Sequence, residues 1–312
     1  MTRICIPDDA PPVLALSPVF PALQARAQLD YYDTLPGTED LLIERLRDAE
    51  VALNIRSSSR FTERVFAACP KLRMVSIWGT GTDHVDLAAA AHHGVTVANT
   101  PGVAARSIAE HTLALLFAVA RRIPHMDAAT RSGKWERGQS MELYGKICGV
   151  IGYGAVGRHF ARLATAIGMR VMLWTLHPAA YPDVEFVDLE TLYRESDVIS
   201  VHLRLSPDTQ SFIDAPQFAL MKPGAIVLNT ARGAIVNEPA LLDALIAGPL
   251  AAAGLDVFTT EPLPPHHPVT TLPNVVLTPH CAGITPEALH AGLQLAVDNI
   301  WTQFSRTTTL PT

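Results

Sequence analysis

Three polar residues in the second half of the chain are of types that could act together on a small carboxylic acid. Arg232, Glu261 and His280 each come at, or shortly after, the end of an apolar stretch that predicts a buried strand. In an open parallel sheet, ligands bind beyond the carboxyl ends of the strands. We therefore expect the guanidinium, the carboxylate and the imidazole to converge on one site.

These side chains are the types that interconversion of a 2-oxo acid and a 2-hydroxy acid requires. A guanidinium at Arg232 would hold the substrate carboxylate through two parallel hydrogen bonds. An imidazolium at His280 would protonate the carbonyl oxygen while a hydride reaches the carbonyl carbon. A carboxylate at Glu261 would fix the tautomer of the imidazole and favour its charged form. Taken alone, Glu261 could be only a turn carboxylate, so the hypothesis depends on all three strand-end positions.

A glycine-rich turn lies upstream of these residues. The apolar stretch 147–151 leads directly into a GxGxxG sequence at 152–157, and a helical pattern follows at 158–167. Gly152 permits the tight turn, Gly154 lets a pyrophosphate approach the backbone, and Gly157 lets helix and strand pack closely. The N-terminus of the helix supplies N–H groups for the phosphates. This context predicts dinucleotide binding.

The next expected strand ends in a neutral residue. A carboxylate about 20 residues after the glycine turn usually accepts a hydrogen bond from the ribose 2′-hydroxyl and repels a 2′-phosphate. Thr175 takes that place here, and the only nearby basic residue is His177, which is mostly neutral at pH 7. We predict that the cofactor is NAD or NADP, with no large preference for NAD.

Stretches typical of strands alternate with stretches typical of helices along most of the chain, which predicts parallel α/β sheets. The expected strands cover residues 51–55, 74–77, 95–97, 147–151, 171–175, 198–202, 225–229, 252–256 and 275–278. The expected helices cover residues 39–48, 62–68, 86–93, 158–167 and 286–304.

A further helix is expected at residues 107–122. Ser107 is its candidate N-cap, and Glu110 follows three residues later, as in a capping box. The helix is apolar on most of its faces, so it should be buried in a core or an interface. Residues 127–145 are polar and are expected to be irregular.

Length and composition limit the function classes. A chain of 312 residues predicts two domains, at about 100–200 residues each. With 48% hydrophobic residues, a net charge of −6 and no basic stripe, nucleic acid is an unexpected partner. No apolar run reaches the roughly 20 residues that span a bilayer. The four cysteines form no CxxC pair, which argues against a zinc site and fits a reducing cytoplasm.

Taken together, these motifs resemble the D-isomer-specific 2-hydroxyacid dehydrogenase family, which includes D-lactate and D-3-phosphoglycerate dehydrogenases and glyoxylate and hydroxypyruvate reductases. The resemblance covers nearly the whole chain. It is carried by residues 79–86, 107–122, 152–157 and 221–225 and by the motifs around Arg232, Glu261 and His280.

The resemblance implies two doubly wound domains with a deep cleft between them. A Rossmann cofactor domain would cover residues 101–284, and a flavodoxin-like substrate domain would cover 1–100 and 285–312. A homodimer would form through the 107–145 region, including Trp135.

The resemblance also assigns roles to individual residues. Arg232 would bind the substrate carboxylate, His280 would act as acid and base, and Glu261 would orient His280. Backbone N–H groups around Thr80 and Gly81 would bind the carboxylate as well. The expected cofactor contacts are Gly152, Tyr153, Gly154, Ala155, Val156, Gly157, Thr175, Leu203, Thr230, Ala231 and Asp256, with Asp256 near the nicotinamide amide.

Several alternatives remain open at this point. Some relatives of the family are corepressors that bind dinucleotide, and fold alone does not exclude that function. A phosphite dehydrogenase also fits the triad, whereas Glu261 disfavours a formate dehydrogenase, in which Gln stands at this site. Arg56 could bind a distal anionic group or lie at the surface, and Trp78 could shorten the pocket or belong to the core. Cys281 reads as a small buried residue rather than a nucleophile.

Overall fold

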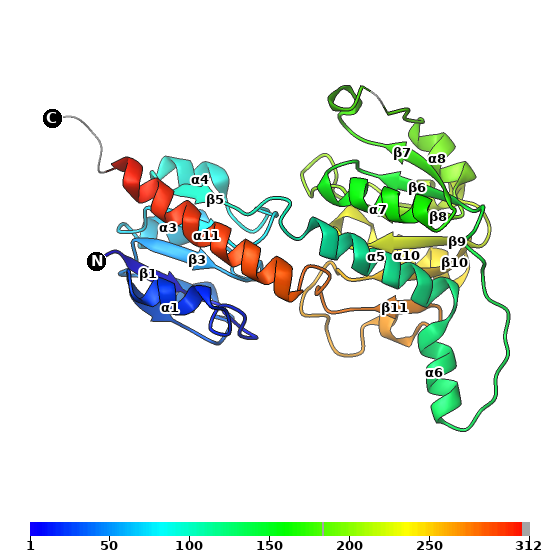
Figure 1. The fold of residues 1–312 in the computed structure, drawn as a ribbon, viewed down its shortest axis with the longest axis horizontal. Helices are drawn as coiled ribbons and strands as arrows, with labels where there is room; N and C mark the ends of the chain where they lie inside the picture. Colours follow the sequence, from blue (N-terminus) through cyan, green and yellow to red (C-terminus); the bar gives the residue numbers. More distant parts are fainter. Residues whose placement is uncertain (183, 308–312) are drawn as a thin grey trace. The chain divides into compact units, whose positions relative to one another are not determined.

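The computed structural model describes residues 1–182 and 184–307. The chain folds into two compact units: Met1–Ala104 together with the segment that begins at Ile284, and Ala105–Gly283. Each unit is a parallel sheet covered by helices (Figure 1). This confirms the predicted fold class.

The first unit is built on a five-stranded sheet in the order β2-β1-β3-β4-β5, which is the flavodoxin-like order. Its strands are β1 (Arg3–Ile6), β2 (Gln28–Tyr31), β3 (Val51–Asn54), β4 (Met74–Ile77) and β5 (Thr96–Ala98). Its helices are α1 (Val19–Gln24), α2 (Glu39–Leu46), α3 (Glu63–Ala68), α4 (Leu87–His92) and α11 (Pro286–Thr307). β1, β2 and α1 were not predicted: β2 is an edge strand without a fully buried residue, and α1 contains a proline, so the local pattern around them is weak.

Three helices of this unit begin at side-chain caps. The side chains of Thr38, Thr62 and Asp86 accept hydrogen bonds from backbone N–H groups in the first turns of α2, α3 and α4. Such caps satisfy N–H groups that have no partner within the helix. They therefore set where each helix begins after its strand.

Helix α11 belongs to the first unit although it ends the described chain. It runs alongside α1 and the sheet (Figure 1), and Leu293, Ala296 and Ile300 are fully buried in the core there. The buried hydroxyl of Ser76 on β4 donates to the Ala296 carbonyl oxygen at 2.7 Å. Apolar burial and this hydrogen bond together hold the helix on the sheet.

The second unit is built on a six-stranded sheet in the order β11-β10-β9-β8-β6-β7. Its strands are β6 (Ile147–Ile151), β7 (Arg170–Trp174), β8 (Val198–Val201), β9 (Ala225–Asn229), β10 (Leu250–Leu255) and β11 (Val275–Leu277). Its α-helices are α5 (Ala105–Ala120), α6 (Ile123–Arg131), α7 (Ala155–Ala166), α8 (Leu189–Glu195), α9 (Ala215–Leu220) and α10 (Glu238–Ile246). All strand pairs between these neighbours are parallel.

Side chains along β9 alternate between two cores, as the pleat of a strand requires. Ile226 and Leu228 face the core that α5 and α7 cover. Ala225 and Val227 face the core that α8, α9 and α10 cover. The sheet therefore carries helices on both faces, and its strand ends are left as the edge where ligands can bind.

Two expectations about the segment that begins this unit are wrong. Helix α5 begins at Ala105, so Ser107 lies inside the helix and does not cap it; Ala105 is itself buried and extends the packed face by half a turn. Part of the segment expected to be irregular is helix α6, which follows Arg122 in the left-handed conformation at φ 51°. Polarity misled the prediction, because an exposed helix can be polar on most faces and be supported by pairs such as Asp127–Arg131.

None of the helices in the described part of the chain combines the length and the apolarity needed to cross a membrane.

Candidate active site

The imidazole of His280 and the carboxylate of Glu261 form a direct pair beyond the carboxyl ends of β11 and β10. Nδ1 of His280 lies 2.6 Å from Oε2 of Glu261, and both side chains are about one third exposed. The other carboxylate oxygen, Oε1, accepts a hydrogen bond from the backbone N–H of Phe258 at 2.9 Å. Because Glu261 accepts at Nδ1, the proton on that nitrogen is held, and Nε2 is left for exchange with a ligand.

The surroundings of Glu261 favour its ionised form. Burial raises the pKa of this carboxyl, but the hydrogen bond and charge of His280, the Phe258 N–H group and the charge of Arg232 outweigh that effect. The net result is a pKa below the ordinary value. Glu261 is therefore ionised at neutral pH and can stabilise a positive imidazolium beside it.

The backbone at His280 is held in an uncommon conformation. Its φ is 52°, in the left-handed region that residues other than glycine rarely adopt. The His280 N–H group donates to the carbonyl oxygen of Asp256 at 2.7 Å and to that of Thr278 at 3.1 Å. These bonds help the loop to keep a conformation that points the imidazole toward Glu261.

Arg232 follows β9 in a loop that packs on the segment leading to Glu261. The side chain of Asn229 holds this loop, because its amide donates to the Arg232 carbonyl oxygen at 3.0 Å and its oxygen accepts from Ala231 N at 3.0 Å. A Cβ at Gly233 would lie 2.0 Å from the carbonyl carbon of Phe258. Only glycine allows so close an approach, so Gly233 brings the Arg232 loop next to the Glu261 segment.

Asp256 is fully buried at the end of β10. Its Oδ1 accepts hydrogen bonds from the Thr278 hydroxyl at 2.6 Å and from Cys281 N at 2.9 Å, and its Oδ2 accepts from Ala282 N at 3.0 Å. The Asp256 carboxylate is thus bound within the protein to residues that precede and follow His280. A contact between Asp256 and a nicotinamide amide stays a prediction.

The turn between β6 and α7 has the form that a dinucleotide requires. Gly152 has φ 99°, and a Cβ there would lie 2.6 Å from the carbonyl oxygen of His202. A Cβ at Gly157 would lie 2.0 Å from the carbonyl oxygen of Gly152. At Gly154, the N-cap of α7, nothing lies within 4 Å of such a Cβ. The crowded glycines shape the turn, and the open one leaves room for a phosphate at the helix N-terminus.

Other expected cofactor contacts lie near this turn. Gly152 N donates to the carbonyl oxygen of Trp174 at 2.8 Å, so Thr175, which comes next along the chain, is close to the turn. Leu203 is buried just after β8, and its backbone N would lie 3.0 Å from a Cβ at Gly152. The ring of Tyr153 makes edge contacts with Tyr181 and Phe186. Ala155 and Val156 form the first turn of α7.

Two expected contacts follow β9. Ala231 is partly buried, and its N–H group is held by Asn229. The side chain of Thr230 is buried, and its hydroxyl lies 2.8 Å from that of Thr112 on α5. A cofactor contact at Thr230 would therefore come from its backbone.

The expected carboxylate-binding loop lies in the first unit, beyond the end of β4. Asn99 donates to the carbonyl oxygen of Thr80 at 2.7 Å, and Thr100 accepts from Gly79 N at 2.8 Å. Thr80 is exposed and Gly81 is partly buried. The loop is thus anchored to the segment after β5, while its tip is open to a ligand.

Arg56 and Trp78 also lie beyond strand ends of the first unit. Burial lowers the pKa of Arg56, and one of its guanidinium nitrogens donates to the carbonyl oxygen of Pro11. Its guanidinium carbon lies 5.9 Å from the centre of a Trp78 ring. A Cβ at Gly292 on α11 would lie 2.5 Å from Nε1 of Trp78. Trp78 therefore packs tightly on α11, which supports the core interpretation of this residue.

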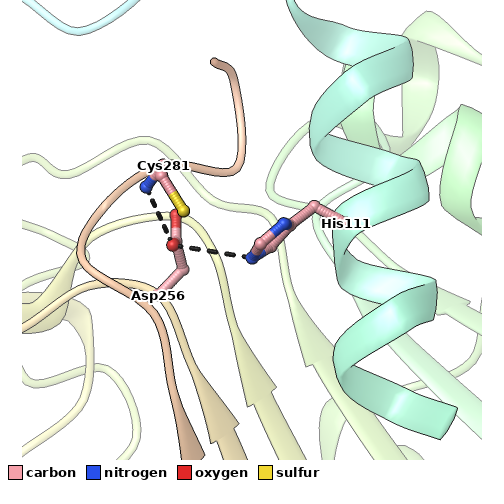
Figure 2. A group of neighbouring side chains, drawn as sticks. All are labelled: His111, Asp256 and Cys281. Atoms are coloured by element: carbon pink, nitrogen blue, oxygen red, sulfur yellow. Dashed lines mark hydrogen bonds and ion pairs between the residues drawn. The ribbon is translucent and has the colours of Figure 1, made fainter. Parts of the chain in front are cut away.

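A group of polar residues that was not predicted supports the His280 loop from helix α5. His111 lies on α5, and its Nε2 is 3.0 Å from the hydroxyl of Thr278 and 3.6 Å from Oδ1 of Asp256. Figure 2 shows His111 directed from the helix toward Asp256, with Cys281 on the other side. The available signal was the pair His111–Thr112, which directly precedes the apolar run 113–120 on the same helix.

Comparison with known proteins identifies the family. Residues 113–282 match the family model for the NAD binding domain of D-isomer specific 2-hydroxyacid dehydrogenase. The glyoxylate reductase of Aeropyrum pernix is 37% identical over 310 residues, which cover 93% of this chain and 92% of that protein. The solved structure of an acyclic imino acid reductase in complex with NADPH and D-Arg is similar with a TM-score of 0.89, at 28% identity and with 98% of both chains covered.

Another relative is longer than this chain. The D-3-phosphoglycerate dehydrogenase of Archaeoglobus fulgidus is 42% identical over 254 residues, which cover 79% of this chain and 48% of that protein. This chain therefore matches about half the length of that enzyme.

The parallel sheet with its glycine-rich turn defines a dinucleotide-binding protein. The chain belongs to the D-isomer specific 2-hydroxyacid dehydrogenase family. It is accordingly an oxidoreductase that uses NAD or NADP.

Proposed function

We propose that this chain interconverts a small 2-oxo acid and the corresponding D-2-hydroxy acid, with His280 as acid and base, Glu261 orienting it and Arg232 binding the carboxylate. The observation that carries the proposal is the 2.6 Å contact between Nδ1 of His280 and Oε2 of Glu261. It supports an imidazole of fixed orientation with Nε2 available to a substrate oxygen.

In the reducing direction, a cofactor held at the glycine-rich turn 152–157 would supply a hydride for the carbonyl carbon. His280 donates the proton on Nε2 to the carbonyl oxygen as negative charge develops there. Glu261 stabilises the imidazolium before the transfer, and the neutral imidazole then regains a proton from solvent. In the oxidising direction, the neutral imidazole accepts the hydroxyl proton.

Arg232 contributes charge and orientation. A guanidinium presents two parallel N–H groups to a carboxylate, which fixes the plane of the substrate as well as holding it. The Asn229 bonds and the close packing at Gly233 support a well-positioned guanidinium. We keep Thr80 and Gly81 as further carboxylate-binding residues, with their backbone N–H groups as donors.

We propose that both NAD and NADP serve as cofactors. Thr175 presents a neutral hydroxyl where a carboxylate would repel a 2′-phosphate. Related proteins support each choice in part, because the matching family model is named for NAD and the imino acid reductase structure contains NADPH.

We also propose a homodimer through the 107–145 region. The apolar side of α5 is largely buried within its own unit, so α5 alone does not require a partner. The apolar residues left exposed lie further along: Ile123, Trp135 and Tyr144 are 52%, 82% and 76% exposed. The proposal therefore depends on α6 and the segment after it.

We further propose that the protein is cytoplasmic. All four cysteines are free thiols, which supports a reducing compartment.

The test is oxidation of NADH and of NADPH with a panel of 2-oxo acids: glyoxylate, hydroxypyruvate, pyruvate, phenylpyruvate, 2-oxoglutarate and phosphohydroxypyruvate. We expect turnover with at least one small member of the panel. Tight NADH binding without turnover of any panel member, or of the corresponding D-hydroxy acids with NAD and NADP, would favour a nucleotide-sensing protein instead.

A further inference from the structure

Two consecutive residues of helix α5 each reach one of the two loops that carry the proposed catalytic groups. The Thr112 hydroxyl lies 2.8 Å from the hydroxyl of Thr230, two residues before Arg232. Nε2 of His111 lies 3.0 Å from the hydroxyl of Thr278, two residues before His280. One turn of one helix thus contacts both loops.

The direction of the first contact follows from the donors present. The Thr112 hydroxyl donates its single hydrogen to the carbonyl oxygen of Ile108 at 2.7 Å. The hydrogen shared with Thr230 must therefore come from Thr230, and Thr112 accepts it. Both side chains are buried, so removal of the acceptor would leave the Thr230 hydroxyl without a partner, which destabilises this conformation of the loop.

The direction of the second contact follows in the same way. Thr278 donates its hydrogen to Oδ1 of Asp256 at 2.6 Å, so His111 must donate from Nε2 to the Thr278 oxygen. Asp256 also accepts from Cys281 N and Ala282 N. A chain of hydrogen bonds thus runs from α5 through Thr278 and Asp256 to Cys281 and Ala282, which follow His280. Figure 2 shows His111, Asp256 and Cys281 of this group.

His111, Asp256 and Cys281 are also types that bind metals, and their ligand atoms lie within 4.8 Å of one another. The hydrogen bonds already explain the arrangement, because Asp256 accepts three of them. Burial raises the pKa of the Cys281 thiol, and the charge of Asp256 raises it further, so the sulfur stays protonated. We therefore interpret the cluster as a support for the loop.

We propose that His111 and Thr112 are positioning residues, which bind the His280 loop and the Arg232 loop to helix α5 and so fix the two loops relative to each other. This proposal rests on the proposed function, because it assumes that His280 and Arg232 act on the substrate. Catalytic groups must be held to a fraction of an ångström, and a displacement of about 1 Å can lower a rate on the order of 100-fold. A shared helix fixes the position of one loop relative to the other.

The test separates the two contacts by their kinetic effects. Thr112→Val should raise KM for the 2-oxo acid by about tenfold, with a smaller fall in kcat, since it acts through the Arg232 loop. His111→Ala should lower kcat by about 10- to 100-fold with little change in that KM, since it acts through the His280 loop. Thr230 and Asp256 are also expected cofactor contacts, so the Kd for NADH is measured in both variants and should change less than the affected kinetic constant.

Conservative and control variants distinguish positioning from a general loss of stability. Thr112→Ser keeps the acceptor, and His111→Gln places an amide donor near the position of Nε2, so both should restore most of the activity. Thr165→Val on α7 removes a hydroxyl that also bonds the carbonyl oxygen four residues earlier. His93→Ala removes a histidine that also bonds through Nε2. Neither control should change kcat or KM.

A second readout does not depend on turnover. In His111→Ala, the amides of Cys281 and Ala282 should exchange with solvent faster than in the wild type, whereas His93→Ala should not change them. Unchanged exchange together with wild-type kcat would overturn the proposal, as would an equal loss of kcat in His111→Ala and His111→Gln. If the wild type turns over no panel substrate, the proposed function fails, and amide exchange still decides whether His111 holds the loop.

Discussion

Gly233 and Phe258 approach each other so closely that a single methyl group would not fit between them. A Cβ at Gly233 would lie 2.0 Å from the carbonyl carbon of Phe258 and 2.4 Å from Thr259 N. Gly233 follows Arg232, and Phe258 N donates to Glu261. This backbone contact therefore joins the loop of the proposed carboxylate-binding residue to the segment whose N–H group holds the Glu261 carboxylate.

Gly233→Ala should impair both stability and catalysis. The new methyl group must push the Arg232 loop away from Phe258, and overpacking of this kind typically costs 1–3 kcal/mol. We expect a lower midpoint of urea unfolding and a higher KM for the 2-oxo acid. Gly94→Ala is the comparison, because Gly94 has φ 69° but no atom within 4 Å of a Cβ. It should lower stability and leave KM unchanged; a wild-type KM in Gly233→Ala would contradict the linkage.

His280→Ala should abolish turnover while dinucleotide binding is retained. General acid–base groups contribute about 100- to 10,000-fold to kcat, and the glycine-rich turn lies on a different element. The measurements are kcat with the best panel substrate and the Kd for NADH by fluorescence titration. Turnover of wild-type rate in this variant would remove His280 from the mechanism. Arg232→Ala, in contrast, should raise KM and also lower kcat.

Glu261→Gln should lower kcat and change the pH dependence of stability. Loss of the negative charge removes the partner that stabilises an imidazolium at His280, which is the proposed proton donor in reduction of the 2-oxo acid. For stability, the folded pKa of Glu261 lies below its ordinary value of 4.5. The stabilisation is therefore present above about that pH and is lost as the pH falls through the folded pKa.

Urea unfolding of wild type and Glu261→Gln across pH 3–7 checks the stability effect. The wild type should be more stable at neutral pH, by on the order of 1 kcal/mol for a charge-assisted hydrogen bond. That difference should shrink below about pH 4.5. A difference that grows toward acidic pH would show that the sign of the pKa shift is wrong.

Thr175→Asp should impair the use of NADP far more than the use of NAD. The introduced carboxylate would accept hydrogen bonds from the ribose hydroxyls and repel a 2′-phosphate. The measurement is kcat/KM for both cofactors in the wild type and the variant. A wild-type preference for NAD above about a thousandfold, or roughly 4 kcal/mol, would mean that groups other than Thr175 set the choice.

Trp135→Asp should weaken the proposed dimer. Trp135 is 82% exposed, and aromatic residues are enriched in protein–protein interfaces. Light scattering at micromolar concentration should give the mass of a dimer for the wild type and a lower mass for the variant. Leu16→Asp is the matched control, because Leu16 is also 82% exposed but lies outside the proposed interface. A wild-type monomer would contradict the dimer.

Much of the sheet architecture could be predicted from the sequence. Strands β6 and β9 have the expected bounds, and β4 does as well, because fully buried strands of parallel sheets are continuous apolar runs. The elements that were not predicted are β1, β2, α1, α6, α8, α9 and α10, and α5 begins two residues earlier than expected. Most of these are short or polar, so their local pattern is weak and packing against neighbours decides the structure.

For the candidate site too, the sequence determined some features and the tertiary structure decided others. The sequence by itself determined the residue types at the strand ends and the glycine-rich turn, because chemistry and backbone sterics restrict which residues can stand there. It also left two interpretations of Trp78 open. Only the tertiary structure decided that Trp78 packs on α11 and that Asp256 is fully buried with three hydrogen bonds. Only the tertiary structure connected His111 to Thr278, 167 residues apart in the chain. Contacts of this kind depend on which faces pack together, and no local spacing encodes them.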